Sequence, residues 1–270
     1  MIPADATTRA LTRELIVAFK NDPSHSALLL DFDGTLTPIE KDPEVPTLTV
    51  GEIDLLHRLS ISLGTLAIVS GRTGSFLVGR LGFDTHRETR LIAFGRGGLD
   101  AIDSKGTITA DRAFEQWNAQ MRDLAEQARD VAPLAWIEEK GVVLTFHWRR
   151  APATEQLLRE VAQRAVDLAG LVTREGKQSI EVFPPGLPNK SEVVRALSTN
   201  CRVVAYFGDD IGDLEAFDTL DELEASIQTF RGCVAGDEAP TGMAERADLV
   251  LASSSEMFVL LGAIADELNA

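Results

Sequence analysis

The sequence predicts an α/β protein, a doubly wound parallel sheet into which a smaller α+β unit is inserted. Three observations predict this fold. The apolar run Ala27–Leu30 stops at an acidic, glycine-containing turn, as a buried parallel strand does when it ends at a site. Strands and amphipathic helices then alternate as far as Phe94. The order next changes to two helices, each followed by two strands, before the alternation resumes near Asn189.

These changes of order divide the chain into two parts. We expect a core made of residues 1–102 and 186–270, and an inserted unit made of residues 103–185. Parallel strands of the core need right-handed crossovers, whereas the paired strands of the insertion are typical of antiparallel hairpins. The segment Pro184–Gly186 is expected to be the hinge by which the chain returns to the core.

The elements of the core follow from apolar spacing and from turn signals. Capping-box spacing between Thr49 and Glu52 predicts the start of the second helix. In the first half, helices are expected over Thr8–Lys20, from Thr49 onward and over Phe76–Leu81. Strands alternate with them and are expected over Ala27–Leu30, Thr65–Val69 and Leu91–Phe94. In the second half, a helix is expected over Asn189–Leu197 and a last helix from Ser253 onward. Between them, strands are expected over Arg202–Phe207, Gly232–Ala235 and Asp248–Ala252.

The inserted unit has its own pattern. Helices are predicted over Asp111–Val131 and Pro152–Ala169. Alternating apolar and polar residues predict one hairpin joined at Lys140-Gly141 and a second that turns at Glu175-Gly176-Lys177. Together these elements make a small antiparallel sheet with two helices.

Composition limits the classes of function. The chain has 270 residues, 44% of them hydrophobic and 25% charged, which is ordinary for a globular protein with a sizeable core. Acidic residues outnumber basic ones by 42 to 26, giving a formal net charge of −16. This charge argues against general binding to nucleic acid or anionic membranes. A small anionic substrate stays possible because a metal and a few cations reverse the field locally.

Cysteines and apolar runs indicate the cellular setting. Cys201 and Cys233 lie beside apolar runs without a partner at metal-ligand spacing, so we expect buried, reduced thiols. No apolar stretch approaches the length of a membrane span, and the first ten residues lack the pattern of a signal peptide. The simplest interpretation is a cytoplasmic protein, monomeric or weakly oligomeric.

Polar groups follow three strands of the predicted sheet, and a lysine opens a helix between the second and third of them. In a doubly wound sheet these strand ends meet at one edge. Two neighbouring carboxylates need a cation or a proton between them, and several carboxylates from separate strands suit Mg²⁺. Singly, each group has an ordinary explanation, such as an acidic turn, a helix cap or a solvated lysine. The groups are Asp31, Asp33, Ser70, Gly71, Arg72, Lys190, Asp209, Asp210 and Asp213.

This order of motifs resembles that of the haloacid dehalogenase superfamily of phosphatases. DFDGT, a strand-end serine, a helix-opening lysine and GDD correspond to its four motifs, and the insertion lies between the second and third. Four segments are more narrowly similar to the trehalose-6-phosphate phosphatases: DFDGTLTPI, SGR, IEEKGVVLTFHWR and GKQSIEVFP. Two segments depart from that family's pattern, since GDDxTDE becomes GDDIGDL and GxHGxE becomes GRGGLD, without the histidine near Gly97.

The resemblance implies a mechanism and a role for each matching residue. Hydrolysis of trehalose 6-phosphate to trehalose and phosphate would pass through an aspartyl-phosphate. Asp31 would be the nucleophile and Asp33 the general acid and base. Asp31, the backbone carbonyl of Asp33 and Asp209 would hold Mg²⁺, with Asp210 and Asp213 behind them. Phosphate would be bound by Ser70, Gly71 and Lys190, and the rest of the substrate by Arg72, Glu138, Lys140 and Glu181.

Other interpretations are open. Glu138 and Lys140, two apart on one strand face, are equally typical of a surface salt bridge. The substrate is alternatively another sugar phosphate or a glycosyl-glycerate phosphate. The missing histidine and threonine also permit a catalytically silent, sugar-phosphate-binding regulatory subunit. The residues Asp31, Asp33, Lys190 and Asp209 are all intact, which favours an enzyme because a silent protein need not keep them. In each case the expected partner is a small-molecule sugar phosphate, with neither nucleic acid nor membrane.

Overall fold

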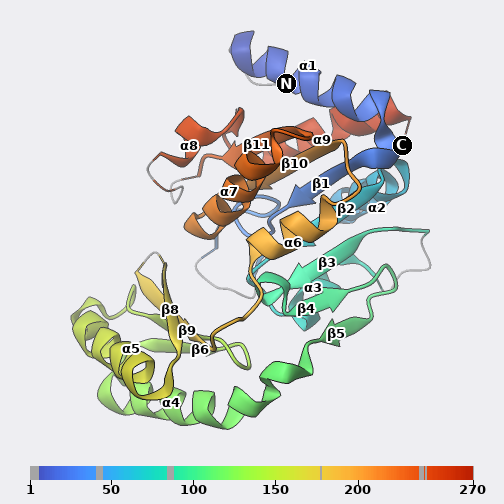
Figure 1. The fold of residues 1–270 in the computed structure, drawn as a ribbon. Helices are drawn as coiled ribbons and strands as arrows, with labels where there is room; N and C mark the ends of the chain where they lie inside the picture. Colours follow the sequence, from blue (N-terminus) through green and yellow to red (C-terminus); the bar gives the residue numbers. More distant parts are fainter. Residues whose placement is uncertain are drawn as a thin grey trace. The chain divides into compact units, whose positions relative to one another are not determined.

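The computed structural model describes residues 6–40, 45–83, 88–176, 178–236, 240 and 242–269. The chain divides into two compact units (Figure 1). The larger unit comprises Met1–Thr109 and Pro188–Ala270, and the smaller unit Ala110–Leu187. The smaller unit thus begins later than residue 103, because the chain after Asp100 first adds strands to the larger sheet.

The larger unit is built on an eight-stranded sheet of order β12-β11-β10-β1-β2-β3-β4-β5. Its six strands from β12 to β3 pair in parallel, and β4 pairs antiparallel with β3. The strands are β1 (Ser26–Leu30), β2 (Thr65–Val69), β3 (Ile92–Gly95), β4 (Asp100–Ile102), β5 (Ile108–Ala110), β10 (Val203–Gly208), β11 (Gln228–Val234) and β12 (Leu249–Leu251). The parallel α/β fold predicted from the sequence is confirmed.

Helices cover both faces of this sheet (Figure 1). Leu28 and Leu30 pack into one apolar cluster, whereas Ala27 and Leu29 pack into the other, so β1 is buried on both sides. That burial explains why its sequence is an uninterrupted apolar run. One face is covered by α1 (Ala6–Asn21), α2 (Val50–Ser62), α3 (Gly74–Leu81) and α9 (Ser254–Leu268), and the other by α6 (Lys190–Leu197), α7 (Leu214–Leu223) and α8 (Met243–Arg246).

The smaller unit is a four-stranded antiparallel sheet of order β6-β7-β9-β8 with two helices on one face. Phe146 and Val182 point into a core shared with the helices, as alternate strand residues must. The neighbouring residues along each strand lie on the opposite face of the sheet. The elements are α4 (Asn118–Val131), β6 (Trp136–Glu139), β7 (Leu144–His147), α5 (Glu155–Ala169), β8 (Val172–Gly176) and β9 (Ser179–Phe183).

Several boundaries differ from those expected. The helix predicted over Asp111–Val131 is a 3₁₀ helix, Arg112–Trp117, followed by α4. The second hairpin does not turn at Glu175-Gly176, because both residues still pair with β9, and Lys177 lies outside the described residues. Strand β11 begins at Gln228 rather than Gly232, since Arg231 interrupts the apolar run but is neutralised by Asp248 and other acids.

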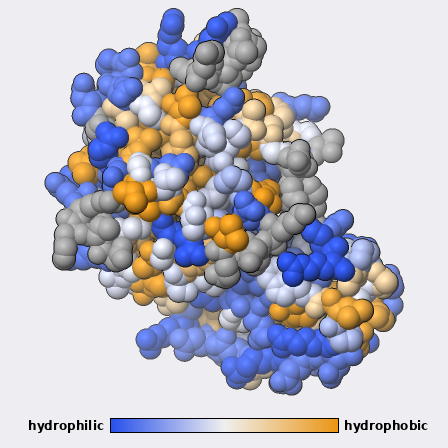
Figure 2. All heavy atoms as spheres, turned by 180° about the vertical axis from the view of Figure 1, so that it is seen from behind, coloured by the Kyte–Doolittle hydropathy of each residue, from blue (hydrophilic) through white to orange (hydrophobic). Residues whose placement is uncertain are grey.

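Exposed large hydrophobic side chains of the described residues come from many parts of the chain. No helix of the described ranges is long and apolar enough to cross a membrane. Figure 2 shows hydrophobic residues interspersed among hydrophilic ones on the face drawn. The most exposed of the large hydrophobic side chains are Val50 in α2, Leu134 in the turn before β6 and Leu168 in α5.

Candidate active site

The site lies where three adjacent parallel strands, β10, β1 and β2, end. The amide of Asp31 continues the pairing of β1 by donating to the Phe207 carbonyl at 2.9 Å. Gly34, in the following turn, has φ +76°, and a Cβ atom there would lie 2.0 Å from Oδ2 of Asp209. Only glycine therefore lets this turn approach Asp209 so closely. The strand ends bring Asp31 and Asp209 together, as the sequence predicted.

Lys190 is buried at this edge of the sheet, with a relative exposure of 8%. It is the first residue of α6, and Asn189 caps that helix by accepting from the Glu192 amide. Its Nζ donates to Oδ1 of Asp31 at 2.9 Å and to Oδ1 of Asp213 at 2.6 Å. The solvated lysine considered from the sequence is therefore wrong. Burial alone would lower the pKa of Lys190, but the charges of Asp213 and Asp31 raise it well above its ordinary value.

Asp213 accepts hydrogen bonds on both carboxylate oxygens. Oδ1 accepts from Lys190 and from the Tyr206 hydroxyl, the latter at 2.5 Å. Oδ2 accepts from the amides of Asp209 and Asp210, at 2.9 Å and 3.0 Å. Burial would raise the pKa of Asp213, yet the charge of Lys190 and these hydrogen bonds lower it. Asp213 is thus a supporting anion whose oxygens already have donors, and Tyr206 is a contributor that the sequence did not single out.

Asp209 shows whether these residues fit a metal ion. Ligand oxygens of Asp31, Asp209 and Asp213 lie within 4.8 Å of one another. Oδ1 of Asp209 is buried without a hydrogen-bond partner, and so is Oγ1 of Thr35 in the turn after β1. Burial first, and then the charge of Asp31, raise the pKa of Asp209 to about 10. A nearby cation would bind the unpartnered oxygen of Asp209 and would stabilise its ionised form. The oxygen donors of Asp31 and Asp209 therefore fit a hard divalent ion.

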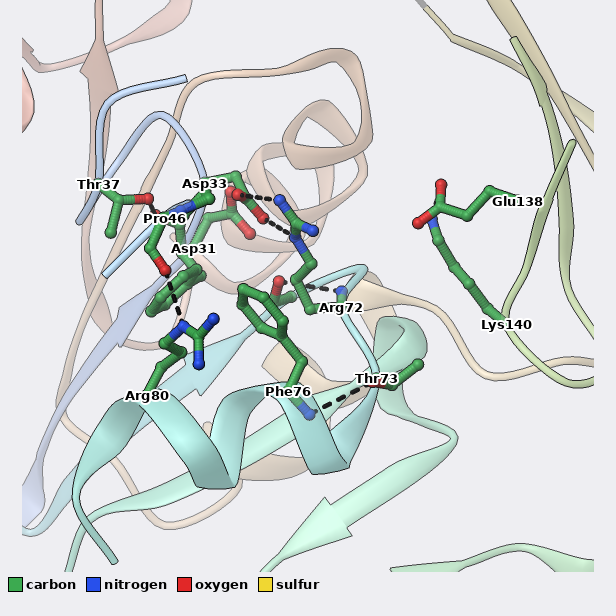
Figure 3. Close-up of polar contacts among 12 residues, drawn as sticks. Asp31, Asp33, Thr37, Pro46, Arg72, Thr73, Phe76, Arg80, Glu138 and Lys140 are labelled. Atoms are coloured by element: carbon green, nitrogen blue, oxygen red, sulfur yellow. Dashed lines mark hydrogen bonds and ion pairs between the residues drawn. The ribbon is translucent and has the colours of Figure 1, made fainter. Parts of the chain in front are cut away.

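Asp33 and Arg72 form a bidentate ion pair, shown in Figure 3. Arg72 Nε and Nη2 each donate to one oxygen of Asp33 at 2.7 Å. The turn that presents Arg72 is fixed by Ser70, whose Oγ accepts from the Arg72 amide at 3.1 Å. Gly71 lies between them, with open space where a side chain would be. Arg72, which the sequence assigned to the substrate, is thus engaged with Asp33.

Asp210 is the predicted residue that lies at the rim. It is exposed, and its Oδ1 caps the short 3₁₀ helix Ile211–Asp213 by accepting from the Gly212 amide at 2.8 Å.

In the smaller unit, Glu138, Lys140 and Glu181 lie together on the sheet face opposite the helices. Strand register aligns Glu138 with Thr145 and Thr145 with Glu181. Lys140 Nζ lies 3.3 Å from Oε2 of Glu138 and 3.6 Å from Oε1 of Glu181. The structure therefore brings the three residues together, with the lysine between two carboxylates.

Each of these two glutamates has a second basic neighbour that the sequence reasoning missed. Nε2 of His147 lies 3.1 Å from Oε2 of Glu138, and the imidazole stacks on Trp136 with 4.3 Å between ring centroids. Arg174 donates to Oε2 of Glu181 at 2.6 Å and 3.0 Å. The sequence did contain a signal for both residues. Side chains alternate along β7 and β8, and this alternation places His147 and Arg174 on the sheet face that carries the two glutamates.

Known proteins match this chain over most of its length. The trehalose-phosphatase family model matches residues 29–246. The chain belongs to the trehalose-phosphatase family. It is 28% identical over 252 residues to a trehalose-phosphatase of Zygosaccharomyces rouxii, covering 81% of this chain but only 27% of that protein. It is 29% identical over 226 residues to a probable trehalose-phosphate phosphatase of Sinorhizobium fredii, covering 81% of this chain and 82% of the relative.

A solved structure shares the fold. The C-terminal domain of trehalose-6-phosphate phosphatase from C. albicans matches with a TM-score of 0.74 at 22% identity, covering 98% of each chain. As the identity is low, this likeness concerns the fold alone. The fold class and the family resemblance inferred from the sequence are both confirmed.

This trehalose-phosphatase family member departs from the expected pattern at GRGGLD, and the structure shows what that segment does. The Gly97 amide donates to the Ser70 carbonyl at 2.9 Å, and the Arg96 amide donates to the Arg72 carbonyl at 2.7 Å. The Arg96 guanidinium pairs with Asp100, whose Oδ2 also accepts from the Gly74 amide at 2.8 Å. The segment therefore braces the turn that carries Ser70 and Arg72.

Proposed function

We propose that this protein is a Mg²⁺-dependent phosphatase that hydrolyses trehalose 6-phosphate to trehalose and phosphate. One observation carries the proposal: a nucleophile candidate, Asp31, is buried beside Lys190 and beside an unpartnered oxygen of Asp209, in a chain of the trehalose-phosphatase family. This set combines a carboxylate that attacks phosphorus with positive charge for the phosphate oxygens.

The chemistry follows from the residues at the strand ends. An oxygen of Asp31 forms a bond to phosphorus while the bond from phosphorus to the sugar oxygen breaks, and Asp33 gives that oxygen a proton. Water then attacks the aspartyl-phosphate, Asp33 takes the proton of the water, and phosphate leaves. Lys190 and Ser70 bind the phosphate oxygens. Asp31, Asp209 and the carbonyl of Asp33 hold Mg²⁺, which when bound offsets negative charge on the phosphate.

In this proposal the smaller unit is a cap that binds the sugar and excludes water from the reaction. Its two glutamates stay ionised at neutral pH. Burial would raise the pKa of Glu138, but the hydrogen bond with His147 and the charge of Lys140 lower it to about 2. The pKa of Glu181 is likewise lowered, by Lys140 and Arg174 against the effect of burial. Ionised carboxylates accept hydrogen bonds from sugar hydroxyls, and Lys140 donates to them.

The first test is phosphate release from a panel of sugar phosphates with Mg²⁺ and after chelation. We expect trehalose 6-phosphate to have the highest kcat/KM, and chelation to lower its turnover by at least about 100-fold, reversibly on adding Mg²⁺. A higher kcat/KM for another sugar phosphate would replace the substrate. Binding of trehalose 6-phosphate without phosphate release would instead favour a silent regulatory subunit.

A second prediction concerns Lys140→Ala. Because this change removes the cation between two half-buried carboxylates, we expect kcat/KM for trehalose 6-phosphate to fall about 100-fold. Turnover of p-nitrophenyl phosphate, which has no sugar, should stay within about threefold of the wild type. Arg122→Ala, which removes an exposed basic side chain of α4, is the matched control. Equal losses on both substrates would exclude Lys140 from sugar recognition.

A further inference from the structure

Phe76 lies between two guanidinium groups beside the proposed active site (Figure 3). The Cζ atom of Arg72 is 4.5 Å from the centroid of its ring, and that of Arg80 is 4.8 Å away. Both distances fall within the range of cation–π attraction. Phe76 is held in α3, whose N-cap is Thr73, and it is neither a predicted site residue nor part of the mechanism above.

Contacts of the Phe76 ring reach the reacting carboxylates by two routes. Its ring meets the fully buried ring of Phe32, the residue between Asp31 and Asp33, edge to face at 5.8 Å. Through Arg72 it also adjoins the bidentate pair with Asp33. On the other side, Arg80 donates to the Pro46 carbonyl at 3.0 Å, which anchors that guanidinium to the loop before α2.

The Asp33–Arg72 pair needs such support. The side chain of Asp33 is 32% exposed and that of Arg72 is 17% exposed. Bidentate geometry favours the pair, but rotamer entropy and the solvent contact of the partly exposed Asp33 carboxylate still oppose it. A ring face against a partly desolvated guanidinium restricts the arginine before it meets its carboxylate.

We propose that Phe76 is a positioning residue, which holds the Arg72 guanidinium beside Asp33 and so fixes the direction of the Asp33 carboxyl group, whether that group is ionised and accepts on both oxygens or protonated and accepts on one. The proposal rests on the proposed function in assigning proton transfer to Asp33. It requires the face of an aromatic ring rather than apolar bulk. A tyrosine at this position should therefore do what phenylalanine does, whereas leucine should not.

The kinetic test compares Phe76→Leu with Phe76→Tyr on two substrates. A sugar phosphate has a poor leaving group that needs a well-placed proton donor, and p-nitrophenyl phosphate does not. We expect Phe76→Leu to lower kcat for trehalose 6-phosphate roughly tenfold with little change in KM. Turnover of p-nitrophenyl phosphate by this variant should stay within about twofold of the wild-type value. Phe76→Tyr should keep wild-type kcat on both substrates.

The matched control is Phe258→Leu, since Phe258 is another partly buried phenylalanine against the same core cluster. Unfolding midpoints of all variants show whether they fold alike. Equal losses in Phe76→Leu and Phe76→Tyr, or a loss in Phe258→Leu as large as that in Phe76→Leu, would reduce Phe76 to ordinary packing and overturn the proposal.

A spectroscopic measurement separates this proposal from the proposed function. The Arg72 side chain gives an Nε–H signal in a ¹⁵N spectrum, identified by its absence in Arg72→Lys. With the guanidinium paired and stacked, that signal should be shifted from the free-arginine position in the wild type and in Phe76→Tyr, and should return towards it in Phe76→Leu. An unmoved signal in Phe76→Leu would overturn the positioning role even if no phosphatase activity were found.

Discussion

Asp31→Asn is expected to abolish turnover of every phosphate ester, with a fall in kcat of at least about 10³-fold. A neutral amide oxygen does not form the aspartyl-phosphate, so the loss should be the same for trehalose 6-phosphate and p-nitrophenyl phosphate. The measurement is phosphate release with saturating Mg²⁺, together with acid quenching to trap phosphorylated protein. No trapped phosphate is expected in the variant.

The same substitution should leave the metal-free protein as stable as the wild type or more stable. Burial raises the pKa of Asp31 well above its ordinary value. The charge of Lys190 opposes this rise, and the charge of Asp213 adds to it. Its ionised form is therefore costly in the folded state, and an amide still accepts from Lys190. Asp123→Asn, at an exposed position of α4, is the control for expression and handling. Phosphate turnover by a folded Asp31→Asn protein would rule out Asp31 as the nucleophile.

Much of this architecture could be predicted because it depends on local pattern. Burial on both faces makes β1 a continuous apolar run, and a parallel sheet requires that the polar ends of β1, β2 and β10 meet. Lys190 could be placed because a helix start fixes its position and the following apolar spacing fixes its face. These features need only a few adjacent residues to be specified.

Contacts between distant segments could not be predicted in the same way. The Asp33–Arg72 pair joins residues 39 apart, and a spacing rule states which strand ends meet but not which side chains pair. Tyr206 looked like one more apolar residue of a buried strand, since only its hydroxyl at Asp213 distinguishes it from phenylalanine. Strand β4 was missed because it has only three residues and begins with Asp100, a buried acid neutralised by Arg96.

Asp213→Asn is expected to destabilise the protein by about 3–5 kcal/mol, in contrast to Asp31→Asn at the same lysine. All four groups that face Asp213 are donors: Lys190 Nζ, the Tyr206 hydroxyl and two amides. An asparagine presents one oxygen and one NH₂ group, so in either orientation its NH₂ meets two donors. Of its two carboxylate partners, Lys190 then keeps only Asp31, whose carboxyl group is itself difficult to ionise. Urea unfolding of the metal-free proteins measures the difference.

The pH dependence of that difference tests its electrostatic origin. The folded-state pKa of Asp213 lies below its ordinary value of 3.8, so its contribution is fully present above that pH and is lost as the pH falls below it. The stability gap between wild type and Asp213→Asn should therefore be largest near neutral pH and shrink below about pH 3.8. Asp210→Asn, which keeps a capping oxygen for the Gly212 amide, should cost less than about 1 kcal/mol. A gap for Asp213→Asn as small as that of Asp210→Asn would mean that the buried carboxylate does not hold Lys190 in place.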